Sequence, residues 1–314
     1  MSRSNPTPAP GYDIIGDIHG YAGALRRLLV QMGYREVEGA FRHDSRKVIF
    51  VGDFIDRGPE QRAVLQIARA MCEAETALAV LGNHEFNAIG WATPDGRGGF
   101  LRPHTEANLR QHREFLLQLG EGSPDYQDAL GWFKSLPVWL ELSGLRVVHA
   151  CWHEPSRLGL RPWLDGLMCF TEAGLREALR RGSPAYDAAE ILMKGPEQRL
   201  PAGMSFADKD GHLRHEVRIK WWDLDATTFR KAAIGVDDRR DELPDLALPV
   251  DYIYRERTPV LFGHYWMNGE PRLTSPTAAC LDFSVAREGY LTAYRWRGES
   301  VLSRDHLVHV AAGG

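Results

Sequence analysis

Five short clusters in the sequence contain side chains that can bind divalent metals. In chain order they read GDIHG (16–20), GDFIDRG (52–58), GNHE (82–85), VVHA (147–150) and FGHYW (262–266). Carboxylate, imidazole and amide ligands together suit first-row divalent ions such as Mn, Fe or Zn, whereas Mg and Ca sites contain oxygen ligands only. The number of candidate ligands indicates two ions rather than one. The side chains in question are Asp17, His19, Asp53, Asp56, Asn83, His84, His149 and His264.

A pair of such ions predicts hydrolysis of a phosphate ester or anhydride. Two divalent ions about 3.5–4 Å apart can share a carboxylate and a water, lower the pKa of that water and hold a phosphoryl oxygen for in-line attack. The expected nucleophile is therefore a hydroxide that bridges the metals. Arg57 offers a planar fork of donors that matches two phosphate oxygens.

The elements that must position these clusters alternate between strand and helix. Apolar runs predict strands at 12–17, 46–53 and 77–85, and helical periodicity predicts helices at 23–34 and 60–74. This order is typical of a largely parallel sheet covered on both faces, with ligands at the carboxyl ends of its strands. After a helical stretch at about 105–135, further strands are predicted at 138–142, 145–150, 259–266, 278–286 and 290–296.

The motifs GDIHG, GDFIDRG and GNHE, in this order, resemble the calcineurin-like metallophosphoesterases and, within them, the phosphoprotein phosphatase branch. The resemblance covers residues 12–150 well. It implies an α/β fold, a four-layer αββα sandwich of two mixed sheets. We expect a flexible tail, 1–11, and one phosphoesterase domain, 12–314, with an insertion or cap at about 155–255, where charge and turn formers interrupt the apolar runs.

The resemblance also implies a role for each residue of the site. Asp53 would bridge the two metals. His84 would be the general acid, and Asp56 would orient it, although Asp56 could instead be a salt-bridge partner of Arg57. Arg57, Asn83 and His84 would contact the substrate. The implied ligands are Asp17, His19 and Asp53 for one metal, and Asp53, Asn83, His149 and His264 for the other. Two divalent ions, Mn, Fe or Zn, are therefore the expected cofactors, with Mn supporting activity in vitro.

Departures from the family pattern bear on the substrate. The chain has GHYW where many relatives have GHxH, so Trp266 cannot be a ligand and water is expected to complete the shell of the first metal. It also reads HACW where protein phosphatases usually have HGG. Together with similarity to bacterial diadenosine tetraphosphatases, and to the phosphatase domains of RNA-repair kinase-phosphatases, in the first third of the chain, this favours a nucleotide-type substrate such as a dinucleoside polyphosphate. The alternatives are a serine/threonine or tyrosine protein phosphatase, and a non-catalytic metal-binding scaffold.

Composition limits the partners. A formal net charge of -4 and a pI near 6.3 argue against duplex nucleic acid. No apolar run approaches the roughly 18 residues of a membrane span, and the N-terminus lacks the apolar segment of a signal peptide. The four cysteines have no metal-binding or disulfide spacing. We therefore expect a cytoplasmic protein whose partner is a phosphorylated small molecule or nucleotide, or a phosphoprotein, and not a membrane.

Several residues have two interpretations. Trp221 and Trp222 could stack a nucleobase, or lie one in the core and one at its rim. Cys151 and His153 lie near His149 but are not needed as nucleophile or ligand, and Glu85 is expected to be a structural partner. Lys194, Arg218 and Lys220 could reach phosphate or be solvated charges. The remaining histidines are expected at surfaces or in local pairs, namely His43, His104, His112, His212, His215, His306 and His309.

Overall fold

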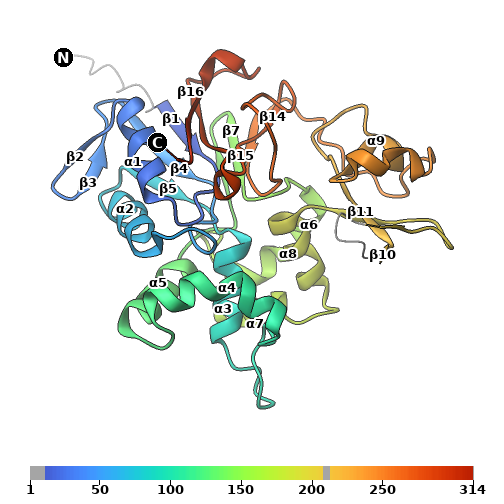
Figure 1. Cartoon of the computed structure of the whole chain (residues 1–314), viewed down its shortest axis with the longest axis horizontal. Helices are drawn as coiled ribbons and strands as arrows, with labels where there is room; N and C mark the ends of the chain where they lie inside the picture. The colour runs from blue at the N-terminus through green and yellow to red at the C-terminus, as the bar shows by residue number, and fades with distance from the viewer. Residues whose placement is uncertain (1–10, 208–212, 314) are drawn as a thin grey trace, which may run out of the picture.

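A computed structural model describes residues 11–207 and 213–313 of the chain, and Figure 1 shows its arrangement. The expected tail lies outside the described residues, except that Gly11 already begins the first strand. His212 also lies outside them. Among the described helices, none has both the length and the apolar character that crossing a bilayer requires.

The larger of two stacked sheets has mixed strand directions. Its order is β15-β16-β1-β4-β5, with β17 paired to β16. β1, β4 and β5 run parallel to one another, whereas β16 runs antiparallel to β1. The parallel part was predicted from the alternation of strand and helix. The strands are β1 (Gly11–Ile15), β4 (Arg46–Phe50), β5 (Ala77–Ala79), β15 (Asp282–Phe283), β16 (Tyr290–Trp296) and β17 (Leu307–Ala311).

The second sheet has the order β14-β13-β7-β6 and is also mixed. β13 runs parallel to β7 and β14, and β6 forms an antiparallel hairpin with β7. Its strands are β6 (Trp139–Leu142), β7 (Leu145–Val148), β13 (Val260–Phe262) and β14 (Ala278–Cys280).

An apolar core joins the two sheets face to face. Ile14 and Ile49 of the first sheet pack with Val147 and Leu261 of the second, and all four are fully buried. Because successive strand residues point to opposite faces, the neighbours of these residues face outward, toward the helices. Helices α1 (Ala22–Gln31) and α2 (Gln61–Glu73) cover the outer face of the first sheet, and α8 (Pro184–Lys194) shares a buried core with the outward-facing Val148 and Phe262 of the second. The predicted four-layer sandwich of two mixed sheets is therefore confirmed.

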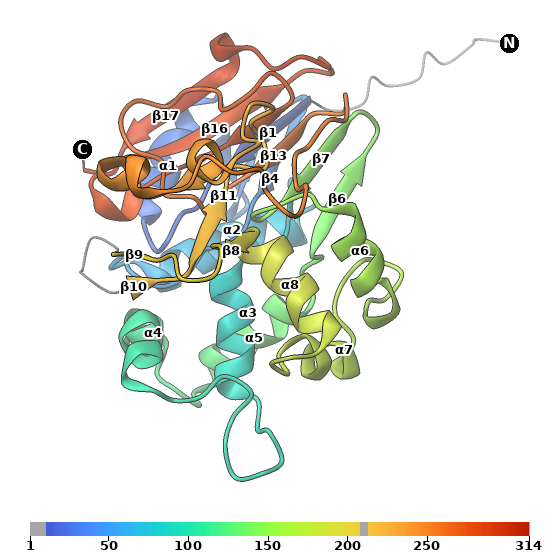
Figure 2. The same ribbon diagram turned by 90° about the vertical axis from the view of Figure 1, so that its right-hand side faces the viewer.

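The helices gather at the sides and at one end of the sheets, as Figure 2 shows for α3, α5 and α7. The predicted helical stretch at 105–135 is two helices, because Ser123 caps a new helix after Gly120. The described helices are α1 (Ala22–Gln31), α2 (Gln61–Glu73), α3 (Asn83–Ala92), α4 (Glu106–Leu119), α5 (Pro124–Lys134), α6 (Glu154–Leu160), α7 (Glu172–Ala178), α8 (Pro184–Lys194) and α9 (Phe229–Ala232).

The region from 155 to 255 has two parts. Its helices α6, α7 and α8 contribute to the main core, for example through Leu160 and Leu192. The following short strands pack on an apolar cluster of their own that contains Val217 and Phe229. Figure 1 places this small sheet on the side of the molecule opposite the β2–β3 hairpin. The remaining strands are β2 (Arg35–Val37), β3 (Ala40–Arg42), β8 (Glu197–Arg199), β9 (Phe206–Ala207), β10 (Leu213–Arg214), β11 (Glu216–Ile219) and β12 (Ala233–Ile234).

Candidate metal centre

The five sequence clusters meet at the carboxyl ends of five strands. Asp17 follows β1, Asp53 follows β4, His149 follows β7 and His264 follows β13. Asn83 differs from the expectation of a strand that runs into a turn: β5 ends at Ala79, and Asn83 is the first residue of α3. The helix start turns the GNHE side chains back toward the ends of the strands.

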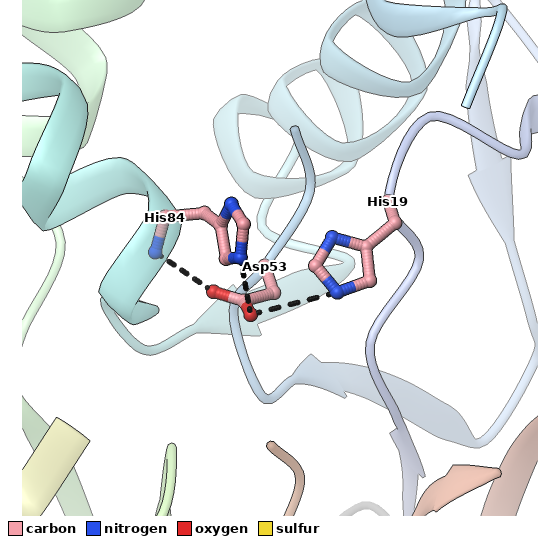
Figure 3. A group of neighbouring side chains, drawn as sticks. All are labelled: His19, Asp53 and His84. Atoms are coloured by element: carbon pink, nitrogen blue, oxygen red, sulfur yellow. Dashed lines mark hydrogen bonds and ion pairs between the residues drawn. The ribbon is translucent and has the colours of Figure 1, made fainter. Parts of the chain in front are cut away.

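Asp53 lies at the centre of the site. Its Oδ2 is 3.6 Å from His19 Nε2, and its Oδ1 is 3.4 Å from His149 Nε2. Figure 3 shows the carboxylate between His19 and His84. One group of potential ligand atoms within 4.8 Å contains His19, Asp53 and His84, and a second contains Asp53, His149 and His264. Asp53 thus belongs to both groups, as a bridging ligand must.

Asn83 joins the second group through its amide oxygen. Asn83 Oδ1 is 2.9 Å from His149 Nε2 and 2.7 Å from His264 Nδ1. Asp17 lies beside this group, since its Oδ2 accepts a hydrogen bond from the His264 backbone N–H at 3.0 Å. The structure therefore brings together all six side chains that were predicted as ligands.

Unpaired buried atoms in the site fit divalent cations. Within the described residues, Asp17 Oδ1, His19 Nε2 and His264 Nε2 are buried without a hydrogen-bond partner. An unpaired buried polar atom costs about 1–3 kcal/mol, which a bound cation would offset. The opposite ring nitrogens of His19 and His149, both Nδ1, bond to the carbonyls of Ile55 and Val51. These bonds fix each ring so that Nε2 faces the site, as is usual for metal-binding histidines.

The electrostatics of the site are those of crowded buried charge. Burial raises the pKa of Asp17 well above its usual value, and the neighbouring carboxylate of Asp282 raises it further. Burial alone would raise the pKa of Asp53 as well. The charges of His149 and the other imidazoles around it outweigh burial and hold that pKa well below its usual range. Against the effect of burial, the carboxylate of Asp53 raises the pKa of His149 to about 10. Divalent cations would supply the positive charge that these carboxylates attract.

The loop after β4 is strained and is held by Glu85. Asp53, Asp56 and Arg57 have φ of 52°, 68° and 70°. A non-glycine residue in this left-handed region costs on the order of 1–3 kcal/mol and requires support from its surroundings. Glu85 supplies that support, since its carboxylate accepts from the backbone N–H groups of residues 53, 54 and 55 at 2.8, 2.9 and 3.2 Å. Its expected structural role is confirmed.

Asp56 holds His84, but a second histidine, His112, also binds it. His84 Nδ1 is 2.5 Å from Asp56 Oδ2, and His112 Nδ1 donates to Asp56 Oδ1 at 2.9 Å. Although burial raises the pKa of Asp56, the two imidazoles, His112 first, lower it to about 2. Within the described residues Asp56 makes no ion pair with Arg57. The orienting role of Asp56 is thus favoured over the salt-bridge alternative.

His112 was expected at the surface or in a local pair, and that expectation is wrong. Only 3% of the residue is exposed, and its partner is 56 positions away in the sequence. A sequence signal for its burial exists: His112 is spaced three, four and seven residues from Phe115, Leu116 and Leu119, so it lies on the buried face of α4. No sequence signal identifies Asp56 as its partner.

Several alternatives are settled by burial. Trp221 and Trp222 are 0% and 5% exposed and pack on Phe262, so the base-stacking interpretation is wrong. Cys151 is fully buried and burial raises the pKa of its thiol well above the usual value, as expected of a structural cysteine.

Two of the three basic residues named in the region 155–255 lie beside acidic side chains. Lys194 pairs with Glu190, and Arg218 lies 3.4 Å from Glu197. Burial lowers the pKa of His264 well below its usual value, and the charge of Arg218 lowers it further. Arg57 is exposed, with its guanidinium carbon 4.2 Å from the ring centre of Trp266.

A family of metal-dependent enzymes matches the part of the chain that contains most of these ligand candidates. Residues 12–182 match the family model for calcineurin-like phosphoesterases. The match covers more than half of the chain, which therefore belongs to the calcineurin-like phosphoesterase family. The divalent metal ions implied by that family fit the ligand groups around Asp53.

Sequence similarity to bis(5'-nucleosyl)-tetraphosphatases covers only part of this chain. An asymmetrical bis(5'-nucleosyl)-tetraphosphatase of Halalkalibacterium halodurans is 42% identical over 74 residues, which are 23% of this chain and 30% of that protein. A symmetrical bis(5'-nucleosyl)-tetraphosphatase of Aromatoleum aromaticum is 30% identical over 136 residues, or 43% of this chain and 42% of that protein. The matched segments thus span less than half of either relative.

Solved structures share the fold over nearly the whole chain. A protein described as a candidate diadenosine tetraphosphatase superimposes with a TM-score of 0.50 at 18% identity, covering 98% of this chain and 96% of that one. The cold-active protein-tyrosine phosphatase of a psychrophilic Shewanella species gives a TM-score of 0.51 at 15% identity, covering 96% and 78%. At these identities the likeness shows the fold alone.

Proposed function

We propose that the chain is a phosphohydrolase with a dinuclear metal centre that acts on nucleotide-type phosphoesters or phosphoanhydrides, such as dinucleoside polyphosphates. The observation that carries this proposal is the position of Asp53, whose carboxylate belongs to two buried groups of ligand atoms at once. Such an arrangement suits a pair of ions that share one ligand.

The proposed ligands divide between the two ions as the family pattern implies. Asp17, His19 and Asp53 would hold one ion. Asp53, Asn83, His149 and His264 would hold the other, and Mn, Fe or Zn suits this mixture of oxygen and nitrogen. When bound, the ions would activate water near neutral pH and polarise the phosphoryl group.

His84 would protonate the leaving oxygen. Its Nδ1 is fixed on Asp56, which leaves Nε2, 3.9 Å from Asp53 Oδ2, to face the reaction. Burial lowers the pKa of His84, but Asp53 and Asp56 raise it above the usual value, so the ring can carry the proton it must donate. By distance, His84 could instead be a metal ligand together with His19 and Asp53. If a His84 variant keeps its metal, His84 is the general acid and not a ligand.

Arg57 would bind the phosphoryl oxygens. It is exposed and directly follows Asp56, and its guanidinium can bind two oxygens and offset charge that develops in the transition state. Asn83 and His84 complete the contacts to the substrate.

A nucleotide substrate is favoured over a phosphoprotein because two relatives with matching segments are named as tetraphosphatases.

The proposal also includes the domain organisation, which is one phosphoesterase domain at 12–314 with an insertion at about 155–255. A cytoplasmic location is also included, because all four cysteines are free thiols.

The test is a substrate panel with manganese-loaded protein. The substrates are p-nitrophenyl phosphate, bis-p-nitrophenyl phosphate, diadenosine tetraphosphate and a phosphopeptide, and kcat/KM is measured for each. We expect diadenosine tetraphosphate to give the highest kcat/KM, chelator to abolish activity, and added manganese to restore it. Preference for the phosphopeptide would favour the protein phosphatase alternative. Metal binding without hydrolysis of any substrate, with Mn, Fe or Zn, would refute an enzymatic function and favour a scaffold.

A further inference from the structure

The guanidinium groups of two arginines lie against the indole ring of Trp266, beside the site. The guanidinium carbon of Arg57 is 4.2 Å from the ring centre and that of Arg287 is 4.3 Å from it. The two carbons are therefore at most 8.5 Å apart, the sum of these distances. The ring of Trp266 is also 5.6 Å from the ring of His19, which places the arginine pair next to the first ligand group.

Within the described part of the chain no acidic side chain bonds directly to either arginine, although the charges of Asp53 and Asp56 act on Arg57 from within the site. Both residues are exposed, and among residues 11–207 and 213–313 neither side chain forms an ion pair or hydrogen bond. Two like charges this close repel each other, and an anion that binds to both would offset that repulsion. Stacking on the indole fixes the plane of each guanidinium and leaves its N–H edge free to donate.

The loops that carry Trp266 and Arg287 are held in place by a buried carboxylate. Asp282, 2% exposed, accepts from the backbone N–H of Trp266 at 2.7 Å and from that of Ser284 at 3.0 Å. Ser284 begins the short 3₁₀ turn Val285–Arg287 and has φ of 59°. Trp266 has φ of 51° and Glu288 has φ of 62°. One buried carboxylate thus ties together two strained loops, and such strain tends to collect at ligand sites.

We propose that Arg287, held with Arg57 on Trp266, binds the phosphoryl group next to the one that is hydrolysed. The site would then prefer linear polyphosphate chains, free or attached to a nucleoside, over phosphate monoesters. This inference rests on the proposed function, because it takes Arg57 to bind the reacting phosphoryl group. It adds a residue, Arg287, from a part of the chain that none of the five sequence clusters includes.

The test compares Arg287→Ala with Arg297→Ala in the full-length, manganese-loaded protein. Arg297 is a matched control because it is also an exposed arginine of the C-terminal part of the chain, and within the described residues no hydrogen bond, ion pair or ring contact joins its side chain to the site. We measure kcat and KM for p-nitrophenyl phosphate and for diadenosine tetraphosphate. Loss of one charge-assisted bidentate contact should lower kcat/KM for the polyphosphate about tenfold, mainly through KM. Both variants should keep the wild-type kcat/KM for the monoester.

A second arm separates the polyphosphate chain from the nucleoside. Arg287→Ala should raise the inhibition constant of inorganic tripolyphosphate, measured against p-nitrophenyl phosphate, about tenfold without changing that of orthophosphate. Arg287→Lys should recover part of the loss, since it keeps the charge but not the fork. An equal loss with both substrates, no loss with either, or an effect on the nucleotide without one on tripolyphosphate would overturn the proposal.

Failure of the proposed function can be told apart from failure of this inference. If the wild-type protein hydrolyses none of the substrates, the proposed function fails. Calorimetric titration with β,γ-methylene ATP then tests Arg287 without turnover. A dissociation constant about tenfold weaker in Arg287→Ala than in Arg297→Ala supports the polyphosphate site, and equal constants contradict it.

Discussion

Gly263 lies against the carboxylate of Asp17, and Gly263→Ala should disable the metal centre. A Cβ at this position would lie 1.8 Å from Asp17 Oδ1 and 2.9 Å from Val51 Cγ2, where ordinary contacts begin at 3.4 Å. To open the first contact from 1.8 to 3.4 Å, Asp17 must move by more than an ångström. It has no free space to do so, because it is 2% exposed and its other oxygen is bonded to the His264 N–H.

The expected loss follows from that displacement. A misplacement of about 1 Å in a catalytic site can cost roughly 10²-fold in rate. Overpacking of a buried site costs typically about 1–3 kcal/mol of stability, which leaves a protein of this size folded at 25 °C. The assays are metal content after dialysis, kcat/KM for the best substrate, and the thermal unfolding midpoint. We expect less than two metals per chain, a rate reduced about 10²-fold and a modestly lower midpoint.

Two further variants make this result decisive. Gly131→Ala, on the exposed face of α5 with no atom within 4 Å, should keep both metals and full activity and should be more stable by up to about 1 kcal/mol. Asp17→Asn keeps the shape of the side chain but loses its charge, so it should lose metal without the steric strain. The reasoning is refuted if Gly263→Ala binds two metals and turns over at the wild-type rate.

The remaining predictions concern residues that would support the chemistry. His84→Asn should keep both metals while kcat falls about 10²–10⁴-fold, as expected on loss of a general acid, whereas loss of metal in this variant would make His84 a ligand. His112→Ala should lower kcat about tenfold through disorder of the Asp56–His84 pair, with KM and metal content unchanged, and a change confined to the unfolding midpoint would reduce His112 to a structural role. Glu85→Gln should cost about 1–3 kcal/mol in free energy of unfolding, because its amide N–H₂ would face backbone N–H groups that now donate to the carboxylate. Denaturant unfolding with and without manganese measures that cost, and an unchanged midpoint would contradict the role given to Glu85.

Short-range patterns in the sequence predict most of the strands and the motifs that follow them. Continuous apolar runs locate β1, β4 and β7 to within a few residues, because these strands are buried on both faces. The residues of one motif are contiguous in the chain, so the motifs predict a set of ligands without reference to the tertiary fold. The start of α3 at Asn83 was not predicted, because the apolar run that precedes it continues past the end of β5.

Pairs that form only through tertiary contact could not be predicted. Nothing in the spacing of His112 indicates Asp56, and nothing in the sequence places Arg287 on Trp266. Trp221 and Trp222 were ambiguous because adjacent aromatic residues suit either a core or a ligand platform. Their burial is decided by Phe262 and Tyr265, about 40 positions further along the chain.

The proposed function requires that Asp53 bridge two metal ions. Anomalous diffraction from crystals of manganese-loaded protein, combined with metal analysis of the same sample, tests it directly. We predict two manganese peaks about 3.5–4 Å apart, with one carboxylate oxygen of Asp53 within bonding distance of both. A single peak, or two peaks of which Asp53 binds only one, would contradict a dinuclear centre bridged by Asp53.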